Sequence, residues 1–197
     1  MDVVFHGCID ALSTDRSELR DRLLIDIASA EIAARKQGRL HHGIQSSGNL
    51  FKRPEASFRV LAGLIAEQVE RYRQRFSSAD GVFIRDFPQT PEFSSSWYVK
   101  MRTGGHLTSH IHETGWLSGV VYLAIPPRPA GSDEGSIEFS THGDDYPQRH
   151  GDFPRSVEAP QVGDIVLFPS SLFHRTVPFT AAEERICIAF DVAPASG

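Results

Sequence analysis

Cysteine, tryptophan and methionine are scarce in this chain of 197 residues, with two of each. Cys8 and Cys187 lie far apart and form no Cys-x-x-Cys pair. Small secreted proteins held by disulfides carry many cysteines, so a disulfide framework is excluded as the basis of the fold. The cysteine content indicates a reduced compartment.

Long apolar runs and an excess of basic charge are also absent. No apolar run approaches the roughly 18 to 20 residues of a membrane span. The N-terminus, Met1–Asp10, lacks the basic segment and apolar core of a signal peptide. The formal net charge is −5 and the basic residues are dispersed, so there is no electrostatic footprint for nucleic acid. We therefore expect a cytoplasmic protein that binds neither membrane nor nucleic acid.

The composition is that of an ordinary globular protein, with 40% hydrophobic and 23% charged residues. The length suits one domain with a sizeable core. We predict a single domain over residues 1–197, with a helical support region at 1–80 and a β-rich core at 82–193. No internal repeat is evident.

Two helices are predicted in the first region. Asp15–Glu18 fits a helix start, and apolar residues then recur at helical spacing up to Gly38. A second helix begins near Pro54 and carries an apolar stripe from Phe58 to Phe76. The intervening segment, Leu40–Asn49, is rich in Gly, Ser and Asn and is predicted to be a loop.

From residue 82 the apolar period changes to two, which is typical of strands. The predicted strands are Val82–Phe87, Ser96–Met101, Ser118–Ile125, Ser136–Ser140, Asp164–Phe168 and Ile186–Val192. Short strands after a helical layer favour a mainly β fold, an antiparallel barrel or jelly roll with helices packed on one sheet.

A cluster of histidines marks the centre of the chain. His110 and His112 are two residues apart, so on an extended segment they point to the same side. His174 follows a strongly β-like run and provides a distant third imidazole. Imidazole is a good ligand for iron, zinc, copper and nickel. We therefore predict a metal site at His110 and His174.

The role of His112 is left open by the sequence. Iron oxygenases commonly combine two histidines with one carboxylate, and the usual motif is His-x-Asp/Glu followed by a distant His. Here a histidine stands where the carboxylate is expected, and Glu113 would face the other way on a continuing strand. His112 is a third ligand, a group that supports a ligand, or a substrate contact. No catalytic residue beyond the metal site is predicted.

Arg185 follows His174 by eleven residues and offers a planar fork that matches a carboxylate. It stands where the distal carboxylate of a 2-oxo dicarboxylate would be held beside the metal. Such a carboxylate usually needs a hydroxyl partner as well, and we predict Tyr98 and Ser118 for that role.

With these residues in hand, the sequence resembles the iron(II)/2-oxoglutarate-dependent oxygenase superfamily over about residues 96–193. It is most similar to a bacterial and phage group of 2-oxoglutarate/iron(II) oxygenases, and it is similar also to aspartyl/asparaginyl β-hydroxylases, which bind iron through two histidines without a carboxylate. The motifs that carry the resemblance are Gly105–His112, Trp116–Leu123, Gly163–Ser170, His174 and Arg185–Asp191.

The resemblance implies a double-stranded β-helix, that is, a jelly roll. It implies Fe(II) held by His110 and His174, with His112 as the unresolved third position, and 2-oxoglutarate reaching Arg185. It further implies a dioxygenase that consumes O2, converts 2-oxoglutarate to succinate and CO2, and usually hydroxylates its substrate. The substrate is not disclosed by the sequence: a small molecule, an amino acid and a protein side chain all fit, and the oligomeric state is also open.

Two other readings compete with the oxygenase. Gly104 before His110 and His112 echoes the first cupin motif, but Trp116 and Leu117 stand where its glutamate belongs. A cupin also has no need for Arg185. The second alternative is a catalytically silent jelly-roll module that binds a partner, although such a module has less reason to retain both His174 and Arg185.

Overall fold

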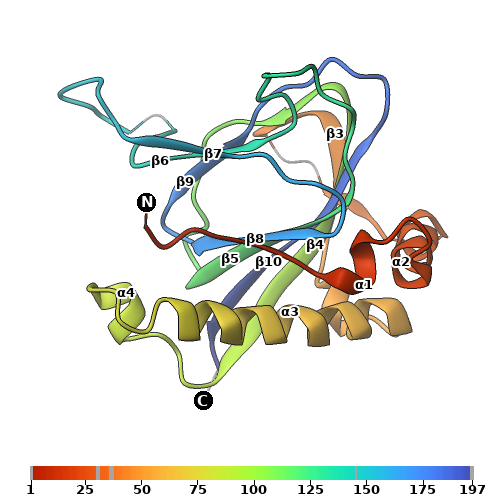
Figure 1. The fold of residues 1–197 in the computed structure, drawn as a ribbon, viewed down its shortest axis with the longest axis horizontal. Helices are drawn as coiled ribbons and strands as arrows, with labels where there is room; N and C mark the ends of the chain where they lie inside the picture. Colours follow the sequence, from red (N-terminus) through yellow and green to blue (C-terminus); the bar gives the residue numbers. More distant parts are fainter. Residues whose placement is uncertain (1, 30–31, 36–37, 145, 196–197) are drawn as a thin grey trace.

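Two antiparallel sheets and a layer of helices make up the protein (Figure 1). The structure is a computed structural model that describes residues 2–29, 32–35, 38–144 and 146–195. The larger sheet lies between the helices and the smaller sheet, so it has two covered faces (Figure 1). One face packs against the helices in an apolar core, and the other faces the smaller sheet across a second apolar cluster and a cavity.

The larger sheet contains seven strands in the order β1-β8-β5-β10-β4-β3-β2, and every neighbouring pair is antiparallel. Its strands are β1 (Phe5–Cys8), β2 (Ala34–Arg35), β3 (Leu40–Ser46), β4 (Pro91–Leu107), β5 (Leu117–Ala124), β8 (Asp164–Pro169) and β10 (Arg185–Pro194). Strands from both ends of the chain therefore meet in one sheet.

The smaller sheet has three strands in the order β7-β6-β9. They are β6 (Ile137–Ser140), β7 (Arg155–Glu158) and β9 (Phe173–Thr176). A second apolar cluster, which includes Phe139, Phe168 and Phe179, fills part of the space between the two sheets. The two sheets thus form the opposite walls of a flattened barrel.

Helices cover the outer face of the large sheet. They are α1 (Asp10–Ser13), α2 (Glu18–Ser29), η1 (Leu50–Lys52, a 3-10 turn), α3 (Ala56–Arg75) and α4 (Val82–Arg85). The long helix α3 runs beneath the sheet (Figure 1), and its buried stripe includes Phe58, Leu61 and Ile65. Among the helices that the structure describes, none has the length and apolar character needed to cross a membrane.

The central strand β10 separates the two faces by simple alternation. Ile188 and Phe190 are fully buried in the core shared with the helices, whereas Arg185 and Asp191 line the cavity toward the small sheet. Successive side chains of a strand point to opposite faces, so one strand serves both the core and the site.

The predicted second helix and most predicted strands agree with the structure to within about two residues at each end, but β4 (Pro91–Leu107) extends well beyond both ends of the predicted strand Ser96–Met101. The first helix is shorter than predicted. It ends at Ser29, and Ala34, assigned by its spacing to that helix, belongs to β2; Ala30 lies outside the described residues. The pairing of β2 with β3 outweighs the local helical pattern there.

Two local predictions are wrong. Val82–Phe87 was expected as a strand but Val82–Arg85 forms helix α4, because Phe83 and Phe87, one helical turn apart, both pack on Tyr72. Leu40–Asn49 was expected as a loop, but Leu40–Ser46 forms β3. Its partner β4 supplies the backbone hydrogen bonds that a polar, glycine-containing segment needs to become a strand.

Candidate metal and co-substrate site

Three histidines converge at one end of the cavity. His110, His112 and His174 each present a ligand atom, and these atoms all lie within 4.8 Å of one another. The ring centroids of His110 and His174 are 4.3 Å apart, and those of His112 and His174 are 5.0 Å apart. The structure therefore brings together all three histidines that the sequence singled out, His112 included.

Backbone hydrogen bonds hold this cluster where the sheets meet. His110 and His174 form an isolated β-bridge in which each N–H donates to the other's carbonyl, at 3.1 and 3.0 Å. The N–H of His112 donates to the carbonyl of Ser170 at 2.9 Å. These main-chain hydrogen bonds fix the backbone of each histidine, so the direction of each ring then depends only on its side-chain torsion angles.

Hydrogen bonds at Nδ1 set that rotation. His110 Nδ1 lies 2.8 Å from the Thr108 carbonyl, and His174 Nδ1 lies 3.0 Å from the Leu172 carbonyl. A carbonyl only accepts, so each Nδ1 carries the proton and each Nε2 keeps its lone pair. A metal ligand that is held and polarised through its other nitrogen is the usual arrangement for histidine.

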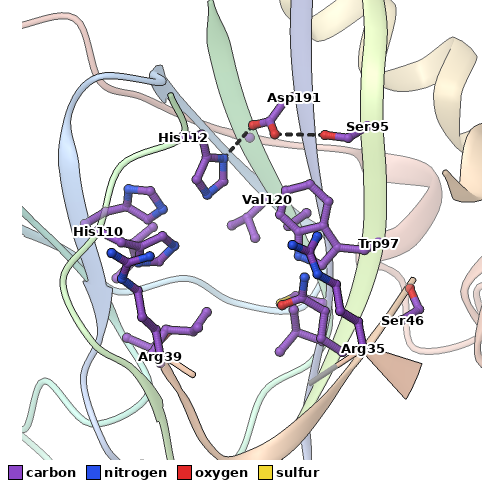
Figure 2. A pocket seen from close by; sticks show the side chains of 18 of the residues that line it. Arg35, Arg39, Ser46, Ser95, Trp97, His110, His112, Val120 and Asp191 are labelled. Carbon is purple, nitrogen blue, oxygen red and sulfur yellow. Dashed lines mark hydrogen bonds and ion pairs between the residues drawn. The ribbon is translucent and has the colours of Figure 1, made fainter. Parts of the chain in front are cut away.

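His112 differs from the other two because its Nδ1 meets a carboxylate. Asp191 Oδ1 lies 2.5 Å from His112 Nδ1 and also accepts from the Ser118 hydroxyl at 2.7 Å. The second oxygen, Oδ2, accepts from the Ser95 hydroxyl at 2.8 Å (Figure 2). Burial opposes the ionised form of Asp191, but the hydrogen bonds and charge of His112 and the two serine hydroxyls outweigh it and lower the pKa of the carboxyl.

Electrostatics favour the neutral form of His110 and His174. Burial and the neighbouring His112 lower the pKa of His110 to about 4. Burial, followed by the charges of His110 and His112, lowers the pKa of His174 well below its usual range. Neutral imidazole is the form that ligates a metal, so the chemistry of this donor set fits a divalent cation.

The histidines open into a cavity of about 340 Å³ between the two sheets. Arg185 lies in the same cavity and is only 2% exposed. Its Nε donates to the Gly135 carbonyl at 3.1 Å, and its Nη1 lies 3.4 Å from Cys187 Sγ. Within the part of the chain that the structure describes, no carboxylate pairs with this guanidinium. A buried charge without a counter-charge is costly unless a ligand supplies one.

Tyr122 stands beside Arg185 and strengthens that conclusion. The guanidinium lies 4.9 Å from the centroid of the Tyr122 ring. The Tyr122 hydroxyl is buried and has no hydrogen-bond partner among the described residues. An unpartnered donor next to an unpaired cation fits a carboxylate with several acceptor sites.

The two hydroxyl residues predicted beside Arg185 lie elsewhere. Tyr98 belongs to the core on the helix side of the large sheet, because its neighbours Trp97 and Val99 occupy the cavity side of β4. Ser118 does lie next to His112, but its hydroxyl is bonded to Asp191 and to Ser170 Oγ at 2.8 Å. Neither side chain lines the cavity where Arg185 lies.

Sequence reasoning missed Asp191 and Tyr122. Asp191 could have been found by the period of two that applies within a strand, because it lies six residues beyond Arg185 on β10. What the sequence could not supply is the register between strands, which decides that Tyr122 rather than Tyr98 lies beside Arg185.

Comparison with known proteins places this site in a family. A model of the family described as "Putative 2OG-Fe(II) oxygenase" matches residues 95–191. This segment contains every histidine of the cluster together with Tyr122, Arg185 and Asp191. No curated protein matches the chain.

Solved structures of similar fold include three relevant cases. HygX from Streptomyces hygroscopicus, with nickel and 2-oxoglutarate bound, is 13% identical and has a TM-score of 0.64 over 98% of this chain and 82% of its own. A prolyl-4-hydroxylase of Pseudomonas putida is 16% identical, with a TM-score of 0.59 over 98% of this chain and 93% of its own. A collagen prolyl hydroxylase of Paramecium Bursaria Chlorella virus-1, solved with 2-oxoglutarate, is 15% identical, with a TM-score of 0.57 over 97% of each chain.

These likenesses confirm the double-stranded β-helix predicted from the sequence. The family match also favours the oxygenase over the cupin and the silent binding module, and it accounts for a histidine cluster and a buried arginine in one cavity. The cofactors expected are those of this group: Fe(II), 2-oxoglutarate and O2. Residues 95–191, which contain the histidine cluster and Arg185, match the model of the iron(II)/2-oxoglutarate-dependent oxygenase family, and the chain as a whole has the fold seen in solved members of that superfamily.

Proposed function

We propose that this oxygenase holds iron(II) with His110, His112 and His174, binds 2-oxoglutarate on Arg185, and hydroxylates a substrate that enters the same cavity. The observation that carries the proposal is the buried Arg185, which has no carboxylate partner among the described residues and shares one cavity with three converging imidazoles. A dicarboxylate that ligates a metal with one end and meets an arginine with the other satisfies both features.

The three imidazoles would supply three nitrogen ligands to the metal. Three ligands on one side of a metal leave its remaining positions for a co-substrate and O2. When bound, iron(II) with 2-oxoglutarate supplies an oxidation in which one atom of O2 enters the substrate and the other enters succinate, with release of CO2. Apolar neighbours of His174, Phe168 and Phe139 among them, limit the access of water to this end of the cavity.

Arg185 and Tyr122 would hold the far carboxylate of 2-oxoglutarate. The guanidinium presents parallel N–H groups to two oxygens, and the Tyr122 hydroxyl donates to a remaining lone pair. Thr176 also lines the cavity, at the end of β9 that lies beyond His174. Binding would thus give Arg185 a counter-charge and the Tyr122 hydroxyl a hydrogen-bond partner, both of which are missing among the described residues.

Asp191 serves as a positioning residue in this proposal. By accepting from Nδ1 it turns Nε2 of His112 toward the other two histidines, and its negative charge makes the imidazole a stronger electron donor. The carboxylate that ordinarily ligates iron directly would here act through a histidine. Ser118 and Ser95 hold the carboxylate in turn.

The test separates metal binding from co-substrate binding. Without O2, the Fe(II) protein should develop a weak visible charge-transfer band when 2-oxoglutarate is added, and with O2 it should form succinate. In Arg185→Met we expect the affinity for 2-oxoglutarate to fall roughly a hundredfold, because charge-assisted hydrogen bonds are lost, while nickel affinity changes by less than about twofold. Arg102→Met removes the same charge from an exposed position of β4 and serves as the control.

Two outcomes would contradict the proposal. One is the absence of both the band and succinate in the wild-type protein. The other is an equal loss of nickel and 2-oxoglutarate affinity in Arg185→Met, which would make Arg185 a structural residue. His112→Ala addresses the third ligand separately, since unchanged nickel affinity in that variant would leave a site with two histidines.

A further inference from the structure

We propose that the substrate carries an oxyanion group, a carboxylate or a phosphate, which Arg35 binds on the wall of the cavity opposite the histidines. This inference rests on the proposed function and deepens it by naming a substrate class. Arg35, Gln45 and Trp97 are the residues that carry it, and all three line the cavity that contains the histidines.

Strand pairing brings Arg35 to the cavity. Arg35 on β2 lies directly opposite Gln45 on β3 in the antiparallel register. Directly paired residues of neighbouring strands project from the same face of a sheet. Figure 2 shows Arg35 reaching past Trp97 on one wall, with His110 on the other. The guanidinium therefore faces the space in which a substrate would meet the metal.

Neither polar side chain bonds to another described residue, and the two differ in burial, since Arg35 is exposed and Gln45 is nearly buried. Among the residues that the structure describes, Arg35 and Gln45 make no side-chain hydrogen bond or ion pair, although Gln45 is only 6% exposed. A nearly buried carboxamide ordinarily finds a partner. An anion between Arg35 and the Gln45 amide would give each of them one, because both groups donate N–H bonds.

The charges around the cavity favour an anion as well. Its charged lining residues are Arg35, Arg39, Arg185 and Asp191. Asp191 is bonded to His112 and the serines, Arg39 forms an ion pair with Asp144, and Arg185 is assigned to 2-oxoglutarate. Arg35 is left as a cation that faces the cavity, in a chain whose net charge is −5. The cavity is thus locally positive in a negative protein, a pattern that concentrates anions.

Trp97 connects this anion site to the reaction centre. Its ring centroid lies 5.5 Å from that of His112, and its side chain is half-buried. A planar group lying on the indole would extend from Arg35 toward the histidines. The class we infer is therefore a small oxyanion with an apolar or aromatic body, oxidised on the part of the molecule that lies away from the anion.

The experiment compares matched probes on the assembled protein. Nickel and saturating 2-oxoglutarate are bound first, so that Arg185 is occupied and no turnover takes place. Calorimetric titration with benzoate, phenyl phosphate and neutral benzamide then measures the wall site. We expect at least one anion to bind roughly tenfold or more tightly than benzamide, and the comparison of the two anions identifies carboxylate or phosphate as the preferred group.

Arg35→Ala should remove the preference for the anion, and Arg102→Ala, with the same change of net charge, should keep it. Equal binding of anions and benzamide by the wild-type protein would overturn the inference, as would an unchanged preference in Arg35→Ala. Loss of 2-oxoglutarate affinity in Arg35→Ala would also overturn it, because Arg35 would then belong to the co-substrate site. Failure of nickel and 2-oxoglutarate to bind at all would instead refute the proposed function, so the two failures are distinguishable.

Discussion

The two faces of strand β10 are built on opposite principles. On the helix side, Ile188 and Phe190 are fully buried among apolar neighbours. On the cavity side, Arg185 and Asp191 are almost as deeply buried but polar, and Arg185 has no counter-ion among the described residues. Adjacent residues of this strand therefore have different roles. Side chains on the helix side stabilise the fold, whereas those on the cavity side have polar groups that can bind ligands.

This difference shows which face of β10 lowers the free energy of unfolding in favour of ligand binding. A core of well-packed side chains gains free energy from every contact. A buried cation without a partner loses free energy until a ligand arrives. Substitutions on the two faces of the same strand should therefore change stability in opposite directions.

The largest effect is expected on the helix face. Phe190→Ala removes a buried ring that packs on Phe51 and Phe93. The free energy of unfolding should fall by about 3–5 kcal/mol, as measured by urea denaturation of the metal-free protein. Ile188→Val, on the same face, should cost roughly 1 kcal/mol. A loss below about 1 kcal/mol for Phe190→Ala would show that this face is not the main core.

Asp191→Asn should have the next largest effect, on metal affinity rather than on folding. The asparagine can still accept from His112 Nδ1 but has no charge, so nickel affinity should fall by roughly 10- to 100-fold. Ser95→Ala removes one of the hydrogen bonds to the carboxylate and should have a smaller effect. Calorimetry with nickel alone measures both variants. Equal affinity in wild type and Asp191→Asn would mean that the carboxylate only packs beside His112.

Arg185→Met should raise the stability of the ligand-free protein. The substitution replaces a buried guanidinium that lacks a carboxylate with an apolar chain of similar length, so a gain of about 1 kcal/mol is expected. Thermal unfolding of the ligand-free proteins measures it. A destabilisation of more than about 2 kcal/mol would show that Arg185 supports the fold, and the contrast between the faces would disappear.

The smallest effect lies at the edge where the two sheets meet. His6 on β1 contacts Glu158 of β7 at 3.0 Å and Asp164 of β8 at 2.8 Å. Burial opposes protonation, but the two carboxylates outweigh it and raise the pKa of His6 above 6.5. A raised pKa in the folded state stabilises the protein below pH 6.5, and this contribution is lost as the pH rises through the folded-state value.

Urea unfolding across pH 5 to 9 tests this link in wild type and His6→Gln. The stability difference between the two proteins should be largest at the acidic end and should shrink toward pH 9. A difference that is constant with pH would show that the histidine is held by packing alone.

The sequence predicted the parts of the molecule that depend on local pattern. Periodicity and composition predicted the apolar stripe of α3 and the apolar runs of β5 and β8. Residue spacing and family motifs predicted that His110, His174 and Arg185 belong to one site. Segments shaped by their neighbours were not predicted. Leu40–Ser46 becomes a strand because β4 lies beside it, and Val82–Arg85 becomes a helix because Tyr72 receives Phe83.

The same limit applies to the candidate site. Because side chains alternate along a strand, Trp97 and Tyr98 must point to opposite faces of the sheet. Only the pairing of β4 with β10 decides which of the two points into the cavity. Arg35 and Gln45 were not predicted as site residues for a related reason. They lie side by side only because of the register between β2 and β3, and no pattern in the sequence predicts that register. Asp191, by contrast, was within reach of alternation along a strand whose Arg185 was already identified.

The bridge between His110 and His174 has a consequence for how this enzyme can diverge. The two residues are tied to each other through their own main chains, one from the segment after β4 and one from β9. Ser47 and Gly48, which lie between β3 and η1, line the cavity but are not part of that tie. Insertions and deletions there can reshape the cavity wall while the bridge keeps the two histidines in place. New substrates can thus be acquired by changing loops alone, with the chemistry inherited intact.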